Sequence, residues 1–128
     1  MAKNLILVDT NILIDVFRGN KNTKKELDAI EGNIAISVIT AMELYRGCKT
    51  NKRKAELTEQ LKAYKIIHLD SEISEKAMQL FNHYTSTNQD MYIADCLIAA
   101  TNIVHKTKLF THNKSDFNFM KSVVFYHP

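Results

Sequence analysis

Short apolar runs alternate along the chain with longer segments in which apolar residues recur at helical spacing. Runs that predict strands lie at residues 4–8, 34–36, 66–69, 108–110 and 123–126. The first run is apolar throughout from Leu5 to Val8, which is typical of a strand covered on both faces. Because strands separated by helices indicate βαβ units and a parallel sheet, we expect a three-layer α/β fold.

The segments between the strands carry helix start signals and amphipathic spacing. Thr23 and Glu26 match a capping box that would open one helix. Asp70 or Ser71 is expected to cap a helix whose apolar face begins at Ile73. The remaining helices are predicted at about 37–48, at a segment whose apolar face is marked by Leu57, Leu61 and Tyr64, and, after an Asp90 cap, up to about His105.

Composition limits the class of protein. The chain has 128 residues, 45% of them hydrophobic and 24% charged, which suits one globular domain over residues 1–128. The two cysteines, Cys48 and Cys96, do not form a Cys-x-x-Cys pair, which favours a reducing compartment. The first apolar run stops at Asp9 and is too short for a signal peptide or a membrane span. We therefore expect a soluble cytoplasmic protein.

Net charge is mildly basic, at +3. Two clusters concentrate that charge, and they consist of Arg46, Lys49, Lys52, Arg53 and Lys54, and of Lys21, Lys24 and Lys25. Such clusters are most often solvated helix faces, but they also suit a polyanionic partner. The charge pattern alone leaves both interpretations open.

Four acidic residues suggest chemistry at one edge of the predicted sheet. Asp9 ends the first strand, Glu43 lies in the helix after the second, and Asp116 follows the strand at 108–110. In a parallel sheet the carboxyl ends of the strands collect along one edge, where such folds bind ligands. Asp95 lies in a helix that is apolar nearly all round. A buried carboxylate there needs a cation, hydrogen bonds or a proton.

Each acid also has a purely local explanation. The alternatives are an N-cap for Asp9, a capping box of Glu43 with Thr40, a helix first turn after Asn113 for Asp116, and a buried ion pair for Asp95. All four acids converging on one edge would be harder to explain in this way.

The donor types narrow the chemistry further. Clustered carboxylates raise one another's pKa, and a divalent cation relieves that repulsion. Oxygen ligands favour Mg²⁺ or Mn²⁺ over zinc, and the sequence lacks both a His-Glu-x-x-His motif and paired cysteines. It also lacks a Walker sequence, a Gly-x-Gly-x-x-Gly loop and a Gly-x-Ser-x-Gly elbow. A magnesium or manganese site is therefore the chemistry that this pattern favours.

Taken together and in order, these motifs resemble a PIN domain, and the short chain resembles the VapC-type toxins of toxin–antitoxin pairs. The motifs are Asp9-Thr10-Asn11, Glu43-Leu44 preceded by Ser37, Asp95-x-Leu97-Ile98-Ala99-Ala100-Thr101, and Thr111-x-Asn113-x-x-Asp116-Phe117. The resemblance covers essentially the whole chain. It implies a five-stranded parallel sheet between helices and an Mg²⁺- or Mn²⁺-dependent endoribonuclease. Such proteins are usually dimeric and are held inactive by a cognate antitoxin.

The resemblance also assigns residues. Position by position, the family's acidic quartet falls on Asp9, Glu43, Asp95 and Asp116. Its supporting polar residues fall on Asn11, Thr111 and Asn113. We expect Asp9 and Asp95 to be the principal metal ligands and Thr111 either to contact a phosphate or to orient a carboxylate.

Three other functions fit parts of the same pattern. The first is a non-toxin PIN nuclease that acts in RNA maturation or on DNA. The second is a catalytically silent module that binds nucleic acid or protein, which would have no evident reason to cluster four acids. The third is a phosphohydrolase of small molecules.

Overall fold

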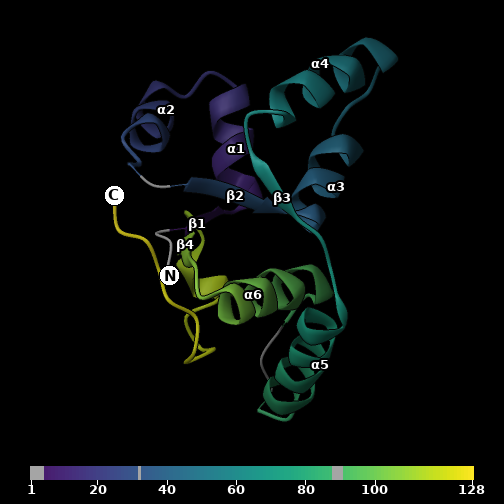
Figure 1. Cartoon of the computed structure of the whole chain (residues 1–128), viewed down its shortest axis with the longest axis vertical. Helices are drawn as coiled ribbons and strands as arrows, with labels where there is room; N and C mark the ends of the chain where they lie inside the picture. Colours follow the sequence, from purple (N-terminus) through teal and green to yellow (C-terminus); the bar gives the residue numbers. More distant parts are fainter. Residues whose placement is uncertain (1–4, 32, 88–90) are drawn as a thin grey trace.

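The computed structural model describes residues 5–31, 33–87 and 91–128. Within these residues a parallel sheet lies between two groups of helices (Figure 1), so the expected α/β architecture is confirmed. In chain order the elements are β1 (Leu5–Val8), α1 (Thr10–Phe17), α2 (Lys21–Asp28), β2 (Asn33–Ser37), α3 (Val38–Arg46), α4 (Asn51–Leu61), β3 (Lys65–Ile67), α5 (Ser71–Thr85), α6 (Ile93–His105), β4 (Lys108–Phe110) and the 3₁₀ helix η1 (Lys114–Asp116).

The order of the strands creates a switch point at β1. The sheet runs β3-β2-β1-β4, and all of its pairs are parallel. From β1 the chain moves outward through β2 to β3, and it then returns through α5 and α6 to β4 on the other side of β1. In open α/β sheets ligands bind at such a reversal, beyond the carboxyl ends of the strands. The topology therefore directs attention to the residues that follow β1 and β4.

The sheet buries both of its faces, which explains the uninterrupted apolar run in β1. Leu7 and Leu109 belong to a core with α5 and α6, whereas Ile6, Val8 and Phe110 belong to a core with α1 to α4. Figure 1 shows α5 and α6 on one side of the sheet and α1 to α4 on the other. Successive side chains of a strand point to opposite faces, so a strand between two helical layers must be apolar at every position.

The expectation of a fifth strand is wrong for the described residues, which contain a four-stranded sheet. The segment predicted at 123–126 makes only one isolated parallel bridge, between Leu109 and Phe125. The backbone N–H of Val123 bonds the carbonyl of Met120 at 3.1 Å, and that of Val124 bonds Oδ1 of Asn102 at 3.3 Å. These donors serve a turn and a buried side chain, so the sheet ladder cannot extend along the segment.

Helix starts follow the expected chemistry at one position and depart from it at another. Asp70 caps α5 by accepting a hydrogen bond from the Ile73 N–H at 2.9 Å, as predicted. The capping box at Thr23 is wrong, because α2 starts at Lys21 and Asn20 accepts the Thr23 N–H at 3.1 Å. The helix predicted from Leu57, Leu61 and Tyr64 is α4, which runs over Asn51–Leu61, buries Leu57 and Leu61 and ends before Tyr64.

The helix that carries Asp95 is buried, as its apolar sequence predicts. Much of α6 is inaccessible to solvent, from Cys96 through Ile98 to Asn102. Asp90, the expected cap of this helix, lies outside the described residues. Within the described part of the chain, every helix is too short or too polar to cross a membrane.

Candidate active site

The β1–β4 pair brings two predicted site residues together. Val8 pairs with Phe110 across the sheet, and the backbone N–H of Asp9 donates to the Phe110 carbonyl at 2.9 Å. The next residues, Asp9 and Thr111, therefore lie side by side at the carboxyl edge, although 102 positions separate them in sequence. Both are buried.

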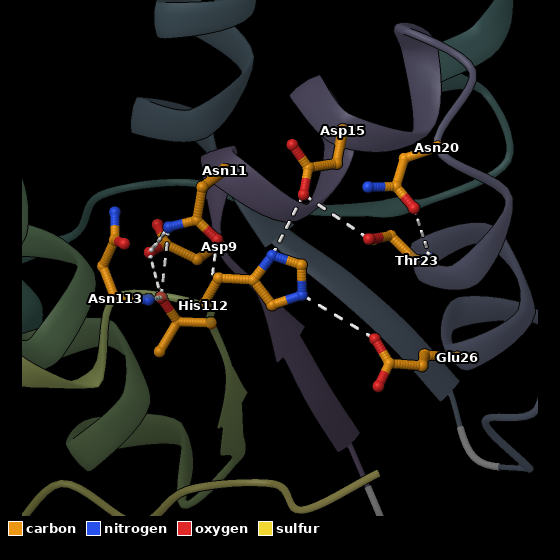
Figure 2. A network of polar contacts seen from close by, with 9 residues as sticks. Asp9, Asn11, Asp15, Asn20, Thr23, Glu26, His112 and Asn113 are labelled. Carbon is orange, nitrogen blue, oxygen red and sulfur yellow. Dashed lines mark hydrogen bonds and ion pairs between the residues drawn. The ribbon is translucent and has the colours of Figure 1, made fainter.

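The Asp9 carboxylate is held by three donors, and Figure 2 shows Asn11 beside it. Oδ1 accepts the Thr10 N–H at 2.8 Å, so Asp9 does cap α1. Oδ2 accepts Asn11 Nδ2 at 2.9 Å and Thr111 Oγ1 at 2.8 Å. Burial raises the pKa of Asp9, the charge of Glu43 adds to that rise, and the three hydrogen bonds oppose it. The N-cap role and a place in the acidic group are thus compatible.

Thr111 orients this carboxylate with all of its hydrogen-bonding capacity. Its hydroxyl donates to Asp9 and accepts from Asn11 Nδ2 at 3.1 Å and from the Asn113 N–H at 3.0 Å. A threonine hydroxyl has one proton and two lone pairs, so none remains for a phosphate. Asn113 contributes through its backbone, and its side chain forms no cap for η1.

Glu43 is positioned by a residue that the sequence analysis did not single out. Thr10 Oγ1 donates to Glu43 Oε1 at 2.6 Å and lies 3.0 Å from the hydroxyl of the buried Thr40. The capping-box alternative for Glu43 and Thr40 is wrong, because Ser37 caps α3 by accepting the Ile39 N–H. The only sequence signal for Thr10 was its place between Asp9 and Asn11.

Asp95 is close enough to the other three acids for their charges to affect its pKa. It lies in the first turn of α6 and is partly buried. Burial raises its pKa to about 7, with further contributions from the charges of Asp116, Asp9 and Glu43, in that order. Among the described residues, no lysine or arginine pairs with Asp95, so the ion-pair alternative finds no support. Asp116 itself is exposed in η1.

The donor set fits a hard divalent cation. Among the described residues, no three His, Cys, Asp or Glu side chains converge closely enough to surround an ion as they stand. Mg²⁺, however, is commonly held by one or two carboxylates, with water completing its octahedron. The three donors to Asp9 occupy two acceptor positions on Oδ2 and one on Oδ1, which leaves Oδ1 with an unused lone pair. The charges of Asp116, Asp9 and Glu43 contribute to the raised pKa of Asp95, and the charge of Glu43 contributes to that of Asp9, so a cation would relieve this repulsion.

A second residue without a sequence signal is His112. Its backbone N–H donates to Asn11 Oδ1 at 3.0 Å, and its ring lies between Asp15 and Glu26 (Figure 2). The sequence shows His112 next to Thr111, but it cannot show that α1 and α2 supply two carboxylates to the ring.

Comparisons with known proteins find relatives that match most of the chain. Ribonuclease VapC1 of Methanocaldococcus jannaschii is 34% identical over 116 residues, which cover 91% of this chain and 81% of that protein. Ribonuclease VapC10 of Mycobacterium tuberculosis is 31% identical over 111 residues, which cover 85% of this chain and 83% of that protein.

Solved structures extend the likeness to the fold. A chain in a toxin–antitoxin complex from Klebsiella pneumoniae superposes with a TM-score of 0.79 at 34% identity, covering 96% of this chain and 99% of that chain. VapBC2 from Rickettsia felis, bound to a promoter DNA fragment, contains a chain with a TM-score of 0.85 at 21% identity, and the match covers 95% and 97%. The PIN domain family model matches residues 6–120. The chain therefore belongs to the PIN domain family, in the VapC group.

Proposed function

We propose that this protein is an Mg²⁺- or Mn²⁺-dependent endoribonuclease and the toxin of a toxin–antitoxin pair. The observation that carries the proposal is the hydrogen-bond network at the carboxyl edge of the sheet, where Asn11 and Thr111 hold the buried Asp9 carboxylate and Thr10 holds Glu43. The charges of Asp9, Glu43 and Asp116 also contribute to the raised pKa of Asp95. Four acids from separate segments of the chain share one electrostatic environment at the switch point of the sheet. The curated relatives named ribonuclease VapC support RNA as the substrate.

In this proposal each of the four acids has its own role at the metal site. Asp9 and Asp95 are the principal metal ligands, and Asp116 and Glu43 complete the site and hold the attacking water. When bound, the divalent ion stabilises charge on the phosphate and lowers the pKa of water. Water attacks phosphorus in line, the bond to the 3′ oxygen breaks, and that oxygen takes a proton, which leaves a 5′-phosphate and a 3′-hydroxyl. Asn11 and Thr111 fix the Asp9 rotamer, and Thr10 fixes Glu43.

The test is cleavage of RNA by the purified protein with Mn²⁺, Mg²⁺ or EDTA. Wild type should cleave only with a divalent ion, and Asp9→Asn and Asp95→Asn should each lose roughly 100-fold or more. Asp28→Asn, which changes an exposed carboxylate on α2, is the matched control and should cleave normally. Cleavage of DNA alone would favour the non-toxin nuclease, and RNA binding without turnover would favour the silent module. Equal activity of Asp95→Asn and wild type would refute the site.

The basic cluster after α3 is proposed to guide RNA toward this site. Arg46, Lys49, Lys52 and Lys54 are exposed, whereas Arg53 lies over the Phe17 ring at 5.5 Å. Exposed lysines contribute through counterion release, so binding of single-stranded RNA should weaken steeply with salt. Replacing Lys49, Lys52 and Lys54 with Gln should reduce the slope of log K against log salt by roughly 2. An unchanged slope would exclude this surface.

A groove of this protein that includes Glu43 is the proposed binding site for the antitoxin. The groove has a volume of about 210 Å³ between α1, α3 and α4, and its lining combines apolar side chains with charged ones: Ile14, Phe17, Leu44 and Leu57 with Glu43, Arg18 and Arg53. Apolar side chains of an antitoxin segment would pack on Ile14, Phe17 and Leu44, and a lysine or arginine of that segment would place a positive charge beside Glu43. The toxin–antitoxin complex from Klebsiella pneumoniae, which contains a chain 34% identical to this one, supports such a partner. Expression of the toxin should arrest growth, and co-expression of the antitoxin should relieve the arrest. Phe17→Asp should keep the arrest and lose the relief.

A homodimer through α5 and α6 completes the proposal. An apolar groove of about 430 Å³ lies between these helices, and Met78 and Ile93 on its lining are 67% and 66% exposed. Exposed apolar residues that gather on adjacent helices mark association surfaces. Light scattering should give a dimer for wild type and a monomer for the double variant Met78→Glu and Ile93→Glu. We place the protein in the cytoplasm, where both cysteines stay reduced.

A further inference from the structure

The His112 ring joins three segments of the chain outside the acidic group. Its Nδ1 lies 3.0 Å from Asp15 Oδ2 on α1, and its Nε2 lies 3.7 Å from Glu26 Oε1 on α2. Figure 2 shows the ring between these two carboxylates, with the Asp9 network on the other side of His112. The ring also stands edge-on to Phe110, with 6.0 Å between the ring centroids. Both ring nitrogens therefore face acceptors, and the aromatic contact limits rotation of the ring.

The backbone of the same residue determines which way the Asn11 amide points. The His112 N–H donates to Asn11 Oδ1 at 3.0 Å, which turns Nδ2 toward Asp9 Oδ2 and Thr111 Oγ1. A flipped amide would place Nδ2 against the His112 N–H and Oδ1 against the Asp9 carboxylate. Two donors would then face each other, and so would two acceptors. The position of the His112 backbone thus specifies the donor that Asp9 receives.

We propose that His112 is a positioning residue that clamps the segment 111–113 to α1 and α2 and so holds Asp9 in place through Asn11 and Thr111. The proposal rests on the nuclease function proposed above, because it assigns His112 a role at Asp9. Residues 112–116 are exposed between the buried Thr111 and Phe117, so apolar packing gives this segment little support. The ring contacts with Asp15 and Glu26 supply that support.

The consequence for catalysis is geometric. Asp9 Oδ2 receives both of its side-chain donors from residues that the clamp orders. A displacement of about 1 Å at a reacting group can cost 100-fold in rate. Loss of the clamp should therefore lower kcat, whereas KM for RNA depends on surfaces that the clamp does not touch.

The experiment compares His112→Ala, His112→Asn and wild type, with His105→Ala as the control at the far end of α6. An asparagine can place a donor near the position of Nδ1, so it should partly restore the contact with Asp15. The first readout is the Asn11 side-chain amide in ¹H–¹⁵N spectra of the metal-free protein. We expect its hydrogens to exchange with water faster in His112→Ala than in wild type. They should be close to wild type in His112→Asn and in the control.

The second readout is steady-state RNA cleavage. His112→Ala should lower kcat by about tenfold or more with KM changed less than about twofold, and His112→Asn should recover part of kcat. An unchanged Asn11 amide in His112→Ala would overturn the clamp, and so would a changed amide with an unchanged kcat. If wild type itself does not cleave RNA, the nuclease function fails. The amide readout then still decides whether His112 orders Asn11.

Discussion

Replacing Asp95 with asparagine should stabilise the metal-free protein above pH 7 while removing its nuclease activity. Asp95 is an acid whose pKa is raised from 3.8 to about 7 by burial and by three neighbouring carboxylates. Between these two pH values the folded chain keeps a proton that the unfolded chain has lost. Unfolding then releases a proton, so the free energy of unfolding falls as pH rises through this window. Above pH 7 Asp95 is ionised in both the folded and the unfolded chain, so the free energy of unfolding is lowered by the full cost of burying its charge.

The size of the effect follows from the shift. A rise from 3.8 to about 7 corresponds, at 1.36 kcal/mol per pKa unit, to an upper bound of about 4 kcal/mol. Because Asp95 is only partly buried, solvent screening reduces this figure, and we expect about 1–2 kcal/mol. For a chain of this length the melting temperature should rise by roughly 4–8 °C at pH 8. At pH 3, where both states carry the proton, the gain should vanish.

The assay is thermal and urea denaturation of wild type and Asp95→Asn from pH 3 to pH 8, in EDTA and again in Mn²⁺. Glu75→Gln, which neutralises an exposed carboxylate on α5, is the control and should show no comparable pH-dependent gain. Saturating Mn²⁺ at about 100 times its Kd should stabilise wild type by about 2.7 kcal/mol and Asp95→Asn by much less. If Asp95→Asn is less stable than wild type at pH 8 in EDTA, the carboxylates do not repel one another as argued.

Three further predictions test separate parts of the structure. Asp116→Asn should lower the Asp95 pKa from about 7, because Asp116 makes the largest contribution of any neighbouring charge. An unchanged Asp95 pKa in an NMR titration of the carboxyl groups would contradict this prediction. Thr111→Val should lower the free energy of unfolding in urea by about 1–3 kcal/mol, because it leaves buried polar groups unpaired, whereas Thr111→Ser should lower it much less. Equal losses in the two variants would show that the hydroxyl does not contribute to stability. Asn102→Leu should speed hydrogen exchange at the Tyr126 N–H, which donates to the Leu109 carbonyl at 2.8 Å, because Asn102 hydrogen-bonds the backbone of Val124. Unchanged exchange would show that the segment 123–126 keeps its position without Asn102.

The predictions from sequence succeeded where a single local property dominates. The apolar run from Leu5 to Val8 required a strand covered on both faces, and the structure has helices on both sides of β1. Asp70 caps α5 because its carboxylate and the Ile73 N–H are three residues apart, a distance fixed by helix geometry. The prediction of a capping box at Thr23 was wrong because Asn20, three residues earlier, accepts the Thr23 N–H that Glu26 would accept in a capping box.

The fifth strand failed for a different reason. The segment 123–126 has the composition of a strand, but Asn102 on a distant helix takes the Val124 N–H. Backbone donors pair with whatever acceptor the fold brings near them, and a side chain that is 22 positions away cannot be read from a local pattern.

By itself the sequence determined the order of strands and helices, the burial of the α6 segment and the choice of oxygen donors, since these depend on residue type and short-range spacing. Only the tertiary structure decided how those donors are held. Thr111 donates its hydroxyl proton to Asp9, Thr10 donates to Glu43 on another helix, and the His112 ring lies between carboxylates of two helices. Each of these contacts joins segments that parallel pairing of β1 and β4, or packing of helices on the sheet, places side by side. Their partners are therefore set by topology, and no spacing along the chain encodes them.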